Sequence, residues 1–326
     1  MTQLRMGPTE WVLIAILSVL WGGSFLFVEL ALVALGPFTV VAARVSLAAL
    51  TLLAWLRIAG LALPRAPRAW FAFLVMGMLN NALPFSLITW GQGHIDAGLA
   101  AVLNATTPFF TVLVAHALTS DERLSARKGF GIAIGFAGVV AMIGPEALGG
   151  LTGSALGQIA VVVASLSYAF AGVFGRRFAA MPSAVAACGM LCGSSLVMIP
   201  TALALEGVPA ALPPAGVLAA LAALAVISTA IGYLIYFRVL ARAGATNLLL
   251  VTFLIPPSAV LMGWAVLDEQ LSGGEALGMA TVLLGLRSDP HDILQVYKYG
   301  SVVPSLCTTT QPLRTRFTNI LGASFS

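Results

Sequence analysis

The chain has 326 residues, of which 60% are apolar and 9% are charged, with a formal net charge of +4. A soluble domain of this length cannot bury so much apolar side chain, so the composition indicates a polytopic membrane protein. The basic residues are scattered between apolar segments, which argues against nucleic-acid binding. The three cysteines suggest neither a disulfide framework nor a metal cluster.

Ten apolar segments follow one another along the chain, separated by short links. They cover residues 11–35, 37–56, 69–90, 97–118, 127–144, 155–175, 183–205, 215–236, 244–267 and 273–286. The first nine are long enough to cross a hydrocarbon core of about 30 Å at about 1.5 Å per residue, whereas the tenth is short. The sequence therefore predicts an all-α polytopic membrane protein with ten transmembrane helices.

The distribution of Lys and Arg predicts the orientation of these spans. Fifteen of the 16 basic residues fall on the side of the membrane that holds both termini, and the sixteenth, Arg44, lies inside a segment. The links on the other side carry His, Asp and Glu but no Lys or Arg. Under the positive-inside rule, we expect both termini to be cytoplasmic and the protein to lie in the cell inner (plasma) membrane.

The two halves of the chain repeat each other. The sequence Asp-Glu-x-Leu-Ser at 121–125 recurs, within one residue of register, at 268–272, and each copy follows an apolar segment with a proline in its middle. We expect a first repeat over residues 1–145 and a second over 153–286. Because each repeat holds five spans, an odd number, the second enters the membrane inverted, which is an architecture typical of secondary transporters. No Gly-x-x-x-x-Gly-Lys-Ser/Thr nucleotide-binding loop is present.

Several stretches also resemble the EamA family of the drug/metabolite transporter superfamily. They are WGGSFLFVELAL, AARVSLAAL, TPFFTVLVAHALTSDERLS and IPPSAVLMGWAVLDEQLS. The resemblance extends over roughly residues 10–286. Within the family, the chain is most similar to YddG-like amino-acid exporters. The resemblance implies a basket of ten helices around a central cavity, and export of small metabolites such as amino acids.

Polar residues inside the spans are candidates for the cavity lining, because an unsatisfied polar group in hydrocarbon is costly. They cluster on the third, fourth, sixth and eighth segments, where Asn104, Thr107 and Thr111 form one helical stripe and Thr229 lies near Tyr233. Hydrogen bonding between spans is the alternative role for each of them. The candidate substrate-binding residues are Trp21, Ser24, Glu29, Arg44, Asn80, Asn81, Asn104, Thr107, Tyr168 and Tyr233.

Glu29 and Arg44 are full charges placed well inside neighbouring spans. Glu29 lies six residues before the end of the first segment and Arg44 seven residues after the start of the second, so we expect them at matching depth, roughly 9–10 Å below the outer surface. They either pair directly or share the outer part of the cavity, where Arg44 receives a substrate carboxylate and Glu29 an ammonium. The alternative for Arg44 is a structural tether.

Other functions remain as alternatives. Within transport, the alternative is efflux of lipophilic cations, with Glu29 as the acidic site. An intramembrane enzyme needs paired carboxylates or a His cluster at membrane depth, and the sequence offers neither. We therefore expect no catalytic residues, no metal and no cofactor, and the protein is expected to be a monomer whose partners are a small substrate and the lipid bilayer. Facilitated diffusion and proton antiport both stay open.

The C-terminal tail differs from the rest of the chain. Apolar character stops at Leu286, and residues 287–326 are rich in Ser and Thr, with no helical periodicity. We expect this tail to be cytoplasmic and largely disordered. It does not continue the family pattern, as a reading-frame change or a fusion would explain.

Overall fold

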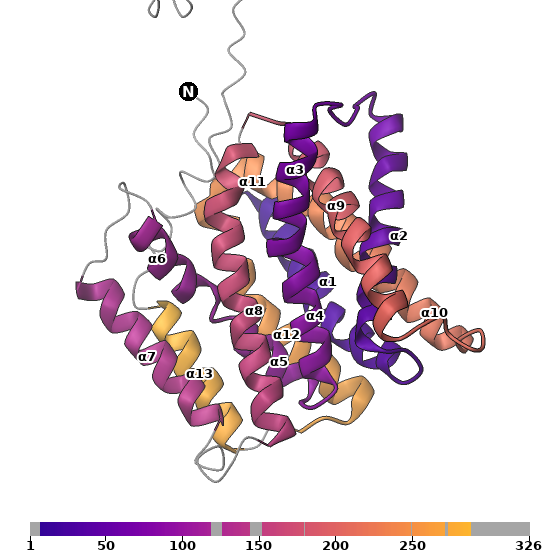
Figure 1. Cartoon of the computed structure of the whole chain (residues 1–326). Coiled ribbons are helices and arrows are strands. Elements are labelled where there is room, and N and C mark those ends of the chain that lie inside the picture. Colours follow the sequence, from indigo (N-terminus) through magenta and orange to yellow (C-terminus); the bar gives the residue numbers. More distant parts are fainter. Residues whose placement is uncertain are drawn as a thin grey trace, which may run out of the picture.

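A computed structural model describes residues 7–118, 126–143, 152–178, 180–248, 250–270 and 273–287, and within these residues every regular element is helical (Figure 1). The first half contains α1 (Pro8–Leu32), α2 (Pro37–Ile58), α3 (Pro67–Gly77), the π-helical turn η1 (Met78–Ala82), α4 (Leu83–Gln92), α5 (Ala97–Asn104), α6 (Thr107–Leu118) and α7 (Ala126–Ile143). The second half contains α8 (Gly153–Gly175), the short 3-10 turn η3 (Arg176–Phe178), α9 (Ser183–Leu205), α10 (Ala215–Ala222), the π-helical turn η4 (Ala223–Ile231), α11 (Gly232–Leu248), α12 (Leu250–Leu267) and α13 (Gly273–Arg287).

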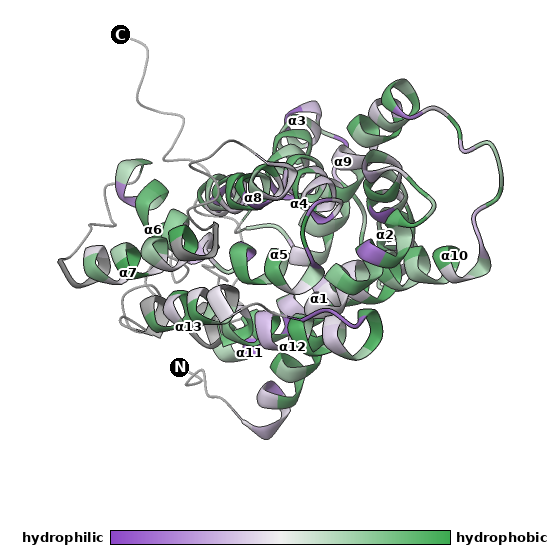
Figure 2. Ribbon diagram, turned by 90° about the horizontal axis from the view of Figure 1, so that it is seen from below, coloured by the Kyte–Doolittle hydropathy of each residue, from purple (hydrophilic) through white to green (hydrophobic). Residues whose placement is uncertain are grey.

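Most of these helices have the length and apolar character of transmembrane spans. In the described part of the chain eight stretches qualify, namely Pro8–Leu32, Pro37–Ile58, Pro67–Gln92, Ala97–Leu118, Gly153–Phe178, Ser183–Leu205, Ala215–Leu240 and Leu250–Leu267. Figure 2 shows ribbons that are hydrophobic along most of their length. The prediction of an all-α polytopic membrane protein is thus confirmed. Two predicted spans correspond to shorter elements: α7 contains the apolar stretch Gly129–Val140, and α13 has 15 residues.

Local sequence explains where several helices begin. Pro8, Pro37 and Pro67 each occupy the first position of a helix, where the missing N–H has no intrahelical acceptor and the fixed φ suits the helix. The first and third helical stretches start two to three residues before the predicted segments, because these prolines, rather than the first long apolar run, set the boundary.

Two long helical stretches, 67–92 and 215–248, each contain a π-helical turn in the interior, at η1 and η4 respectively. Pro84 follows η1, and its ring and missing N–H disturb the hydrogen bond to the preceding turn. A third stretch is broken into α5 and α6 at Ala105 and Thr106, two residues before Pro108. In contrast, α12 stays continuous through Pro256 and Pro257.

The helices pack in a small number of long pairs. The most extensive contacts join α7 with α13, α9 with both α2 and α3, α1 with α12, and α8 with both α4 and α6. The α7–α13 pair forms one edge of the molecule, opposite α2 and α10 (Figure 1). At this edge Gly138 approaches the backbone of α13 so closely that a Cβ there would lie 2.9 Å from the Gly278 carbonyl oxygen. Small residues let two helix backbones approach this closely, whereas Gly135 of α7 faces the Phe109 ring.

The apolar interior is divided into two large clusters. One is built mainly from α1, α5, α6, α8 and α12, and the other mainly from α2, α4 and α9 with residues of η4. Tyr168 of α8 packs against both clusters. The boundary between the two cores is therefore where a polar group can lie inside the molecule without sitting within an apolar cluster.

Candidate functional site

Arg44 lies near this boundary, on α2, with only 8% of its surface exposed. Its Nε donates a hydrogen bond to Thr229 Oγ1 of η4 (3.0 Å), and its guanidinium carbon lies 3.6 Å from the centroid of the Phe85 ring on α4. A cation over an aromatic face is stabilised by the ring quadrupole. Arg44 is thus held by one hydroxyl and one ring, both neutral.

The outer edge of the same guanidinium has no protein partner. No described carboxylate lies within ion-pair distance of Arg44, and no described residue accepts a hydrogen bond from its two terminal nitrogens. These nitrogens are not among the fully buried polar atoms without a partner, so this edge keeps a small exposed surface. The edge presents paired N–H donors, the arrangement that binds a carboxylate through two parallel hydrogen bonds.

A chain of neutral hydrogen bonds lies close to Arg44. Asn80 Nδ2 donates to Tyr233 Oη (3.1 Å), which donates to Asn81 Oδ1 (3.0 Å), and Asn81 Nδ2 donates to Ser194 Oγ of α9 (3.1 Å). The hydroxyls of Tyr233 and Tyr168 are electrostatic neighbours of Arg44. We call Arg44, Asn80, Asn81, Tyr168, Tyr233, Thr229 and Phe85 the Arg44 cluster.

The π-helical turns position part of this cluster. Asn80 and Asn81 belong to η1, and Thr229 belongs to η4. A π turn inserts one residue and leaves some carbonyls available to other donors: Ser167 Oγ donates to the Leu79 carbonyl (2.7 Å), and Thr229 Oγ1 donates to the Leu224 carbonyl (2.7 Å). Since the Thr229 proton is used in this way, its oxygen is oriented to accept from Arg44.

Asn104 and Thr107 lie at the break between α5 and α6. Thr107 Oγ1 donates to the Asn104 carbonyl (2.8 Å), and Ser165 Oγ of α8 also approaches that carbonyl (3.4 Å). Ser165 is one helical turn from Tyr168, so the break faces the same side of α8 as the Arg44 cluster. The Oδ1 atom of Asn104 is buried without a hydrogen-bond partner, and it is an acceptor that a ligand can use.

Trp21 and Ser24 lie on α1. The Trp21 ring packs against Tyr236 at a centroid distance of 5.6 Å, and its approach requires Gly232, where a Cβ would lie 2.7 Å from Trp21 Nε1. Ser24 Oγ donates to the Trp21 carbonyl (2.6 Å) within the same helix. These contacts lie within α1 or between α1 and α11, and none of them involves the Arg44 cluster, so the structure does not place the two residues in it.

Glu29 lies outside the Arg44 cluster and has other polar neighbours. Its Oε2 is 3.5 Å from Gln92 Nε2 at the end of α4, and its electrostatic neighbours are Glu269 and Asp96. Gln92 lies seven residues, or about 10 Å of helix, beyond the Phe85 that stacks on Arg44. The direct Glu29–Arg44 pair, one of the two predicted arrangements, is therefore not formed, because each charge faces a different part of α4.

Two further carboxylates cap helix N-termini at this end of the molecule. Glu269 accepts hydrogen bonds from the backbone nitrogens of Ala97 (2.9 Å) and Gly98 (3.1 Å), at the start of α5. Glu206 accepts from Phe38 N (3.0 Å) and from Thr39 N (2.8 Å) and Oγ1 (2.6 Å), at the start of α2. Helix N-termini favour negative charge, so these contacts tie α9 to α2 and the end of α12 to α5.

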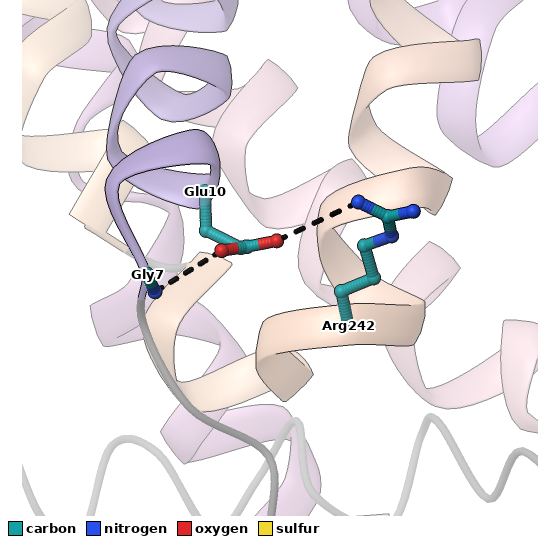
Figure 3. Close-up of polar contacts among 3 residues, drawn as sticks. All are labelled: Gly7, Glu10 and Arg242. Atoms are coloured by element: carbon teal, nitrogen blue, oxygen red, sulfur yellow. Dashed lines mark hydrogen bonds and ion pairs between the residues drawn. The ribbon is translucent and has the colours of Figure 1, made fainter.

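At the opposite end, Glu10 of α1 contacts Arg242 of α11. The ion pair spans 3.8 Å, and Glu10 also accepts from Gly7 N (3.0 Å) (Figure 3). About half of the Arg242 side chain is exposed, so water screens the pair.

Sequence reasoning identified Arg44, Asn80, Asn81, Tyr168 and Tyr233, which the structure brings together. It did not identify Phe85 as a partner of Arg44 or Ser194 as a partner of Asn81. It also did not identify Gln92 as the partner of Glu29. No local signal marks Phe85, an ordinary apolar residue after a proline. Gln92 is the exception, because an amide near the end of an apolar segment is a signal that could have been used.

Comparison with known proteins decides the class. The model of the EamA-like transporter family matches this chain twice, over residues 9–144 and 155–287. The chain belongs to the EamA-like transporter family. The resemblance noted in the sequence is thereby confirmed, and the protein is a multi-pass membrane transporter rather than a member of an enzyme family.

Curated relatives extend this comparison. The chain is 28% identical to the "Uncharacterized inner membrane transporter YedA" of Escherichia coli (strain K12), over 83% of this chain and 87% of that protein. It is 25% identical to the "Probable amino-acid metabolite efflux pump" of the same organism (86% and 94% covered). It is 27% identical to the "Probable terminal-alkyne amino-acid exporter" of Streptantibioticus cattleyicolor (86% and 94%).

A solved crystal structure shares the fold. It superposes with a TM-score of 0.62, at 19% sequence identity, and the match covers 87% of this chain and 96% of that one. In the described residues of the present chain, no group of three or more His, Cys, Asp or Glu side chains is arranged to hold a metal ion.

Proposed function

We propose that this EamA-like protein exports small metabolites, with amino acids as the main substrates, by alternating access. The observation that carries the proposal is the Arg44 guanidinium, which is nine-tenths buried, held by neutral groups and left with an open edge of unpartnered N–H donors. A buried charge without a counter-ion is costly, and a bound carboxylate removes that cost. Two relatives are named as amino-acid exporters or efflux pumps, which agrees with this interpretation.

The proposed site places the substrate carboxylate on Arg44. Tyr168, Tyr233 and Asn80 line the approach, and the free Oδ1 of Asn104 accepts a hydrogen bond from the substrate ammonium. Glu29 does not bind that ammonium in this arrangement. The carboxylate and the ammonium of an α-amino acid are bonded to the same Cα, whereas the partners of Arg44 and Glu29 are about 10 Å apart along α4.

The proposed architecture is ten spans in two inverted five-helix repeats, over residues 1–145 and 153–286. It is supported by the two matches of one family model and by a π turn in the third predicted span of each half. The pairing of helices also supports it, because α2 packs on α9 and α7 on α13, each with its counterpart in the other half. Working sites between inverted repeats suit a rocking exchange of the two halves.

The proposed orientation has both termini in the cytoplasm of a cell inner membrane. The support is the one-sided distribution of Lys and Arg and the inner-membrane location in the name of one relative. We also propose a monomer. The expected cytoplasmic tail is residues 287–326; Arg287 ends α13, and residues 288–326, like the acidic link at 121–125, lie outside the described residues.

Counterflow in proteoliposomes tests the function. Purified protein is reconstituted with a panel of unlabelled zwitterionic amino acids inside, and uptake of the labelled compound is compared with uptake of a labelled quaternary ammonium compound by the same method. Accumulation of amino acids alone supports the proposal. Counterflow of the quaternary ammonium compound alone favours the alternative, efflux of lipophilic cations, and contradicts the assignment of Arg44 as the carboxylate site.

A further inference from the structure

Gln92, which is buried, and Glu29, which is partly buried, form a polar pair that the substrate site does not use. The Gln92 side chain is 2% exposed, and its Nε2 donates a good hydrogen bond to the Phe25 carbonyl of α1 (2.9 Å). The same nitrogen lies 3.5 Å from Glu29 Oε2, which is long for an N–H···O hydrogen bond. The contact thus leaves the Glu29 carboxyl group weakly satisfied.

The other end of the Gln92 amide has no partner at all. Its Oε1 is fully buried and accepts no hydrogen bond in the described structure. A buried acceptor left unsatisfied costs about 1–3 kcal/mol, so such atoms normally indicate a missing donor. The donor must come from a group that reaches the space beside Glu29, because Oε1 belongs to the same planar amide that already approaches Glu29.

The charge around this pair selects for a cation. The electrostatic neighbours of Glu29 are the carboxyl groups of Glu269 and Asp96. Glu269 is engaged with the N-terminus of α5, and no basic side chain among the described residues forms an ion pair with Glu29 or Glu269. The links predicted on this side of the membrane also contain no Lys or Arg. A region lined by one sign of charge concentrates the opposite ion.

We infer that Glu29 is the site at which this transporter binds a proton, with Gln92 as the group that holds the carboxyl in both states. When Glu29 is ionised, it accepts from Gln92 Nε2. When Glu29 is protonated, its O–H supplies the donor that Gln92 Oε1 lacks. One amide therefore serves both forms, and the partly buried carboxyl group changes charge without losing its partner.

This inference deepens the proposed function and rests on it, since it names the ion whose entry drives export. The proton site and the Arg44 cluster are connected through one rigid element. Gln92 and Phe85 both lie on α4, and Phe85 packs under the Arg44 guanidinium. A shift of α4 on protonation of Glu29 moves the aromatic support of the substrate site, which is a physical route for coupling.

Proteoliposomes separate this step from substrate binding. Wild-type protein is expected to show amino-acid counterflow and, in addition, net transport driven by a pH gradient. Glu29→Gln is nearly isosteric and is expected to keep counterflow within about 3-fold while losing at least about 10-fold of the transport driven by the gradient. Glu29→Asp retains a protonatable group and is expected to keep part of that response. Glu10→Gln, which removes a carboxylate at the other end of α1, is the matched control and leaves the response intact.

An infrared measurement makes the test independent of transport. The difference spectrum between acidic and alkaline pH is expected to contain a protonated-carboxyl band that Glu29→Gln removes and Gln92→Met shifts to higher wavenumber, because the hydrogen bond to Oε1 is gone. A wild type driven by a sodium gradient and not by a pH gradient overturns the inference. So does a Glu29→Gln variant that keeps the full pH response, or a band that Gln92→Met leaves unshifted. If wild-type counterflow of amino acids is absent but the band behaves as expected, the proposed substrate fails and the proton site stands.

Discussion

The Arg44 cluster and the Glu29–Gln92 pair each hold one charge, the buried Arg44 and the partly buried Glu29, and these opposite charges do not neutralise each other. Arg44 is supported by a hydroxyl and an aromatic ring, and its outer edge stays open. Glu29 is supported by one weak amide contact among further carboxylates. The two sites share only α4, on which their partners lie seven residues apart.

This difference bears on how each charge is used. A salt bridge between them would have satisfied both groups inside the protein and left little for a ligand. With neutral partners, each site instead retains a capacity for an ion of the opposite sign: an anion at Arg44 and a proton at Glu29. The predictions below test this separation of the charges, from the largest expected effect to the smallest.

A charge-swapped double variant, Glu29→Arg with Arg44→Glu, tests whether the charges are independent. We expect the double variant not to restore the expression and transport lost in the single variants. A carboxylate at position 44 meets Phe85 and Thr229, neither of which is a cation. A guanidinium at position 29 lies near Glu269 and not near position 44, so it cannot neutralise that carboxylate. An unpaired buried charge costs several kcal/mol. The amount of folded protein in the membrane, measured by fluorescence-detected chromatography, should fall well below that of either single Gln variant. Normal expression and transport of the swap would show that the residues act as a pair.

Arg44→Gln is expected to impair transport while preserving the fold. Charge-assisted hydrogen bonds contribute about 1.5–3 kcal/mol, which corresponds to roughly a 10- to 100-fold loss of apparent substrate affinity. The matched control is Arg57→Gln, at the exposed end of the same helix, which should transport normally. If Arg44→Gln expresses well and its KM for zwitterions is unchanged, Arg44 is a tether and not a ligand.

Glu269→Gln tests the carboxylate that neighbours Glu29 without facing Arg44. The amide accepts fewer of the two backbone hydrogen bonds at the start of α5 and loses the favourable charge at a helix N-terminus. A loss of about 1–3 kcal/mol in stability is expected. Thermal unfolding in detergent measures it, with the exposed neighbour Asp268→Asn as control. An unchanged transition temperature would mean that this cap adds little to the packing of α5 on α12.

Tyr233→Phe removes one hydroxyl from the Arg44 cluster. Asn80 and Asn81 each lose a neutral hydrogen bond, and about 1 kcal/mol, or roughly a 5-fold change in apparent affinity, is the expected scale. Counterflow at several substrate concentrations separates an effect on KM from one on maximal rate. An effect as large as that of Arg44→Gln would assign the main ligand contact to Tyr233.

Arg242→Gln breaks the exposed ion pair with Glu10 at the other end of α1. Because the pair is long and half exposed, the expected loss is below about 1 kcal/mol, and it should shrink further at high salt. Transport is expected to be unaffected. A larger, salt-insensitive loss would indicate that α1 and α11 depend on this contact.

The sequence was sufficient to predict the class of fold and most of the interior polar residues, because both follow from the cost of polar groups in hydrocarbon. It named Arg44, Asn80 and Tyr233 as candidates for a cavity lining; the structure brings the three side chains together, and the cavity stays a prediction. The partners escaped prediction, since Thr229 reaches Arg44 across 185 positions in the chain and Phe85 has no polar signature.

Depth along a helix was a poorer guide than packing. Counting residues from the facing ends of the predicted segments 11–35 and 37–56 predicted a matching level for Glu29 and Arg44, yet each side chain meets a different turn of α4. The π turns at η1 and η4 were also not foreseen, although Pro84 lies directly after η1. The ten spans and their inversion stay predictions, as does the tail, of which residues 288–326 lie outside the described structure.

Competition by substrate analogues tests the central claim, that Arg44 receives the carboxylate of the substrate, most directly. In wild-type proteoliposomes an amino acid should inhibit counterflow of its labelled form at least about 10-fold better than its methyl ester, which keeps the ammonium but has no carboxylate charge. In Arg44→Gln this preference should disappear, so that both compounds inhibit equally and weakly. Equal inhibition by acid and ester in the wild type, or a preference that survives in Arg44→Gln, would contradict the account.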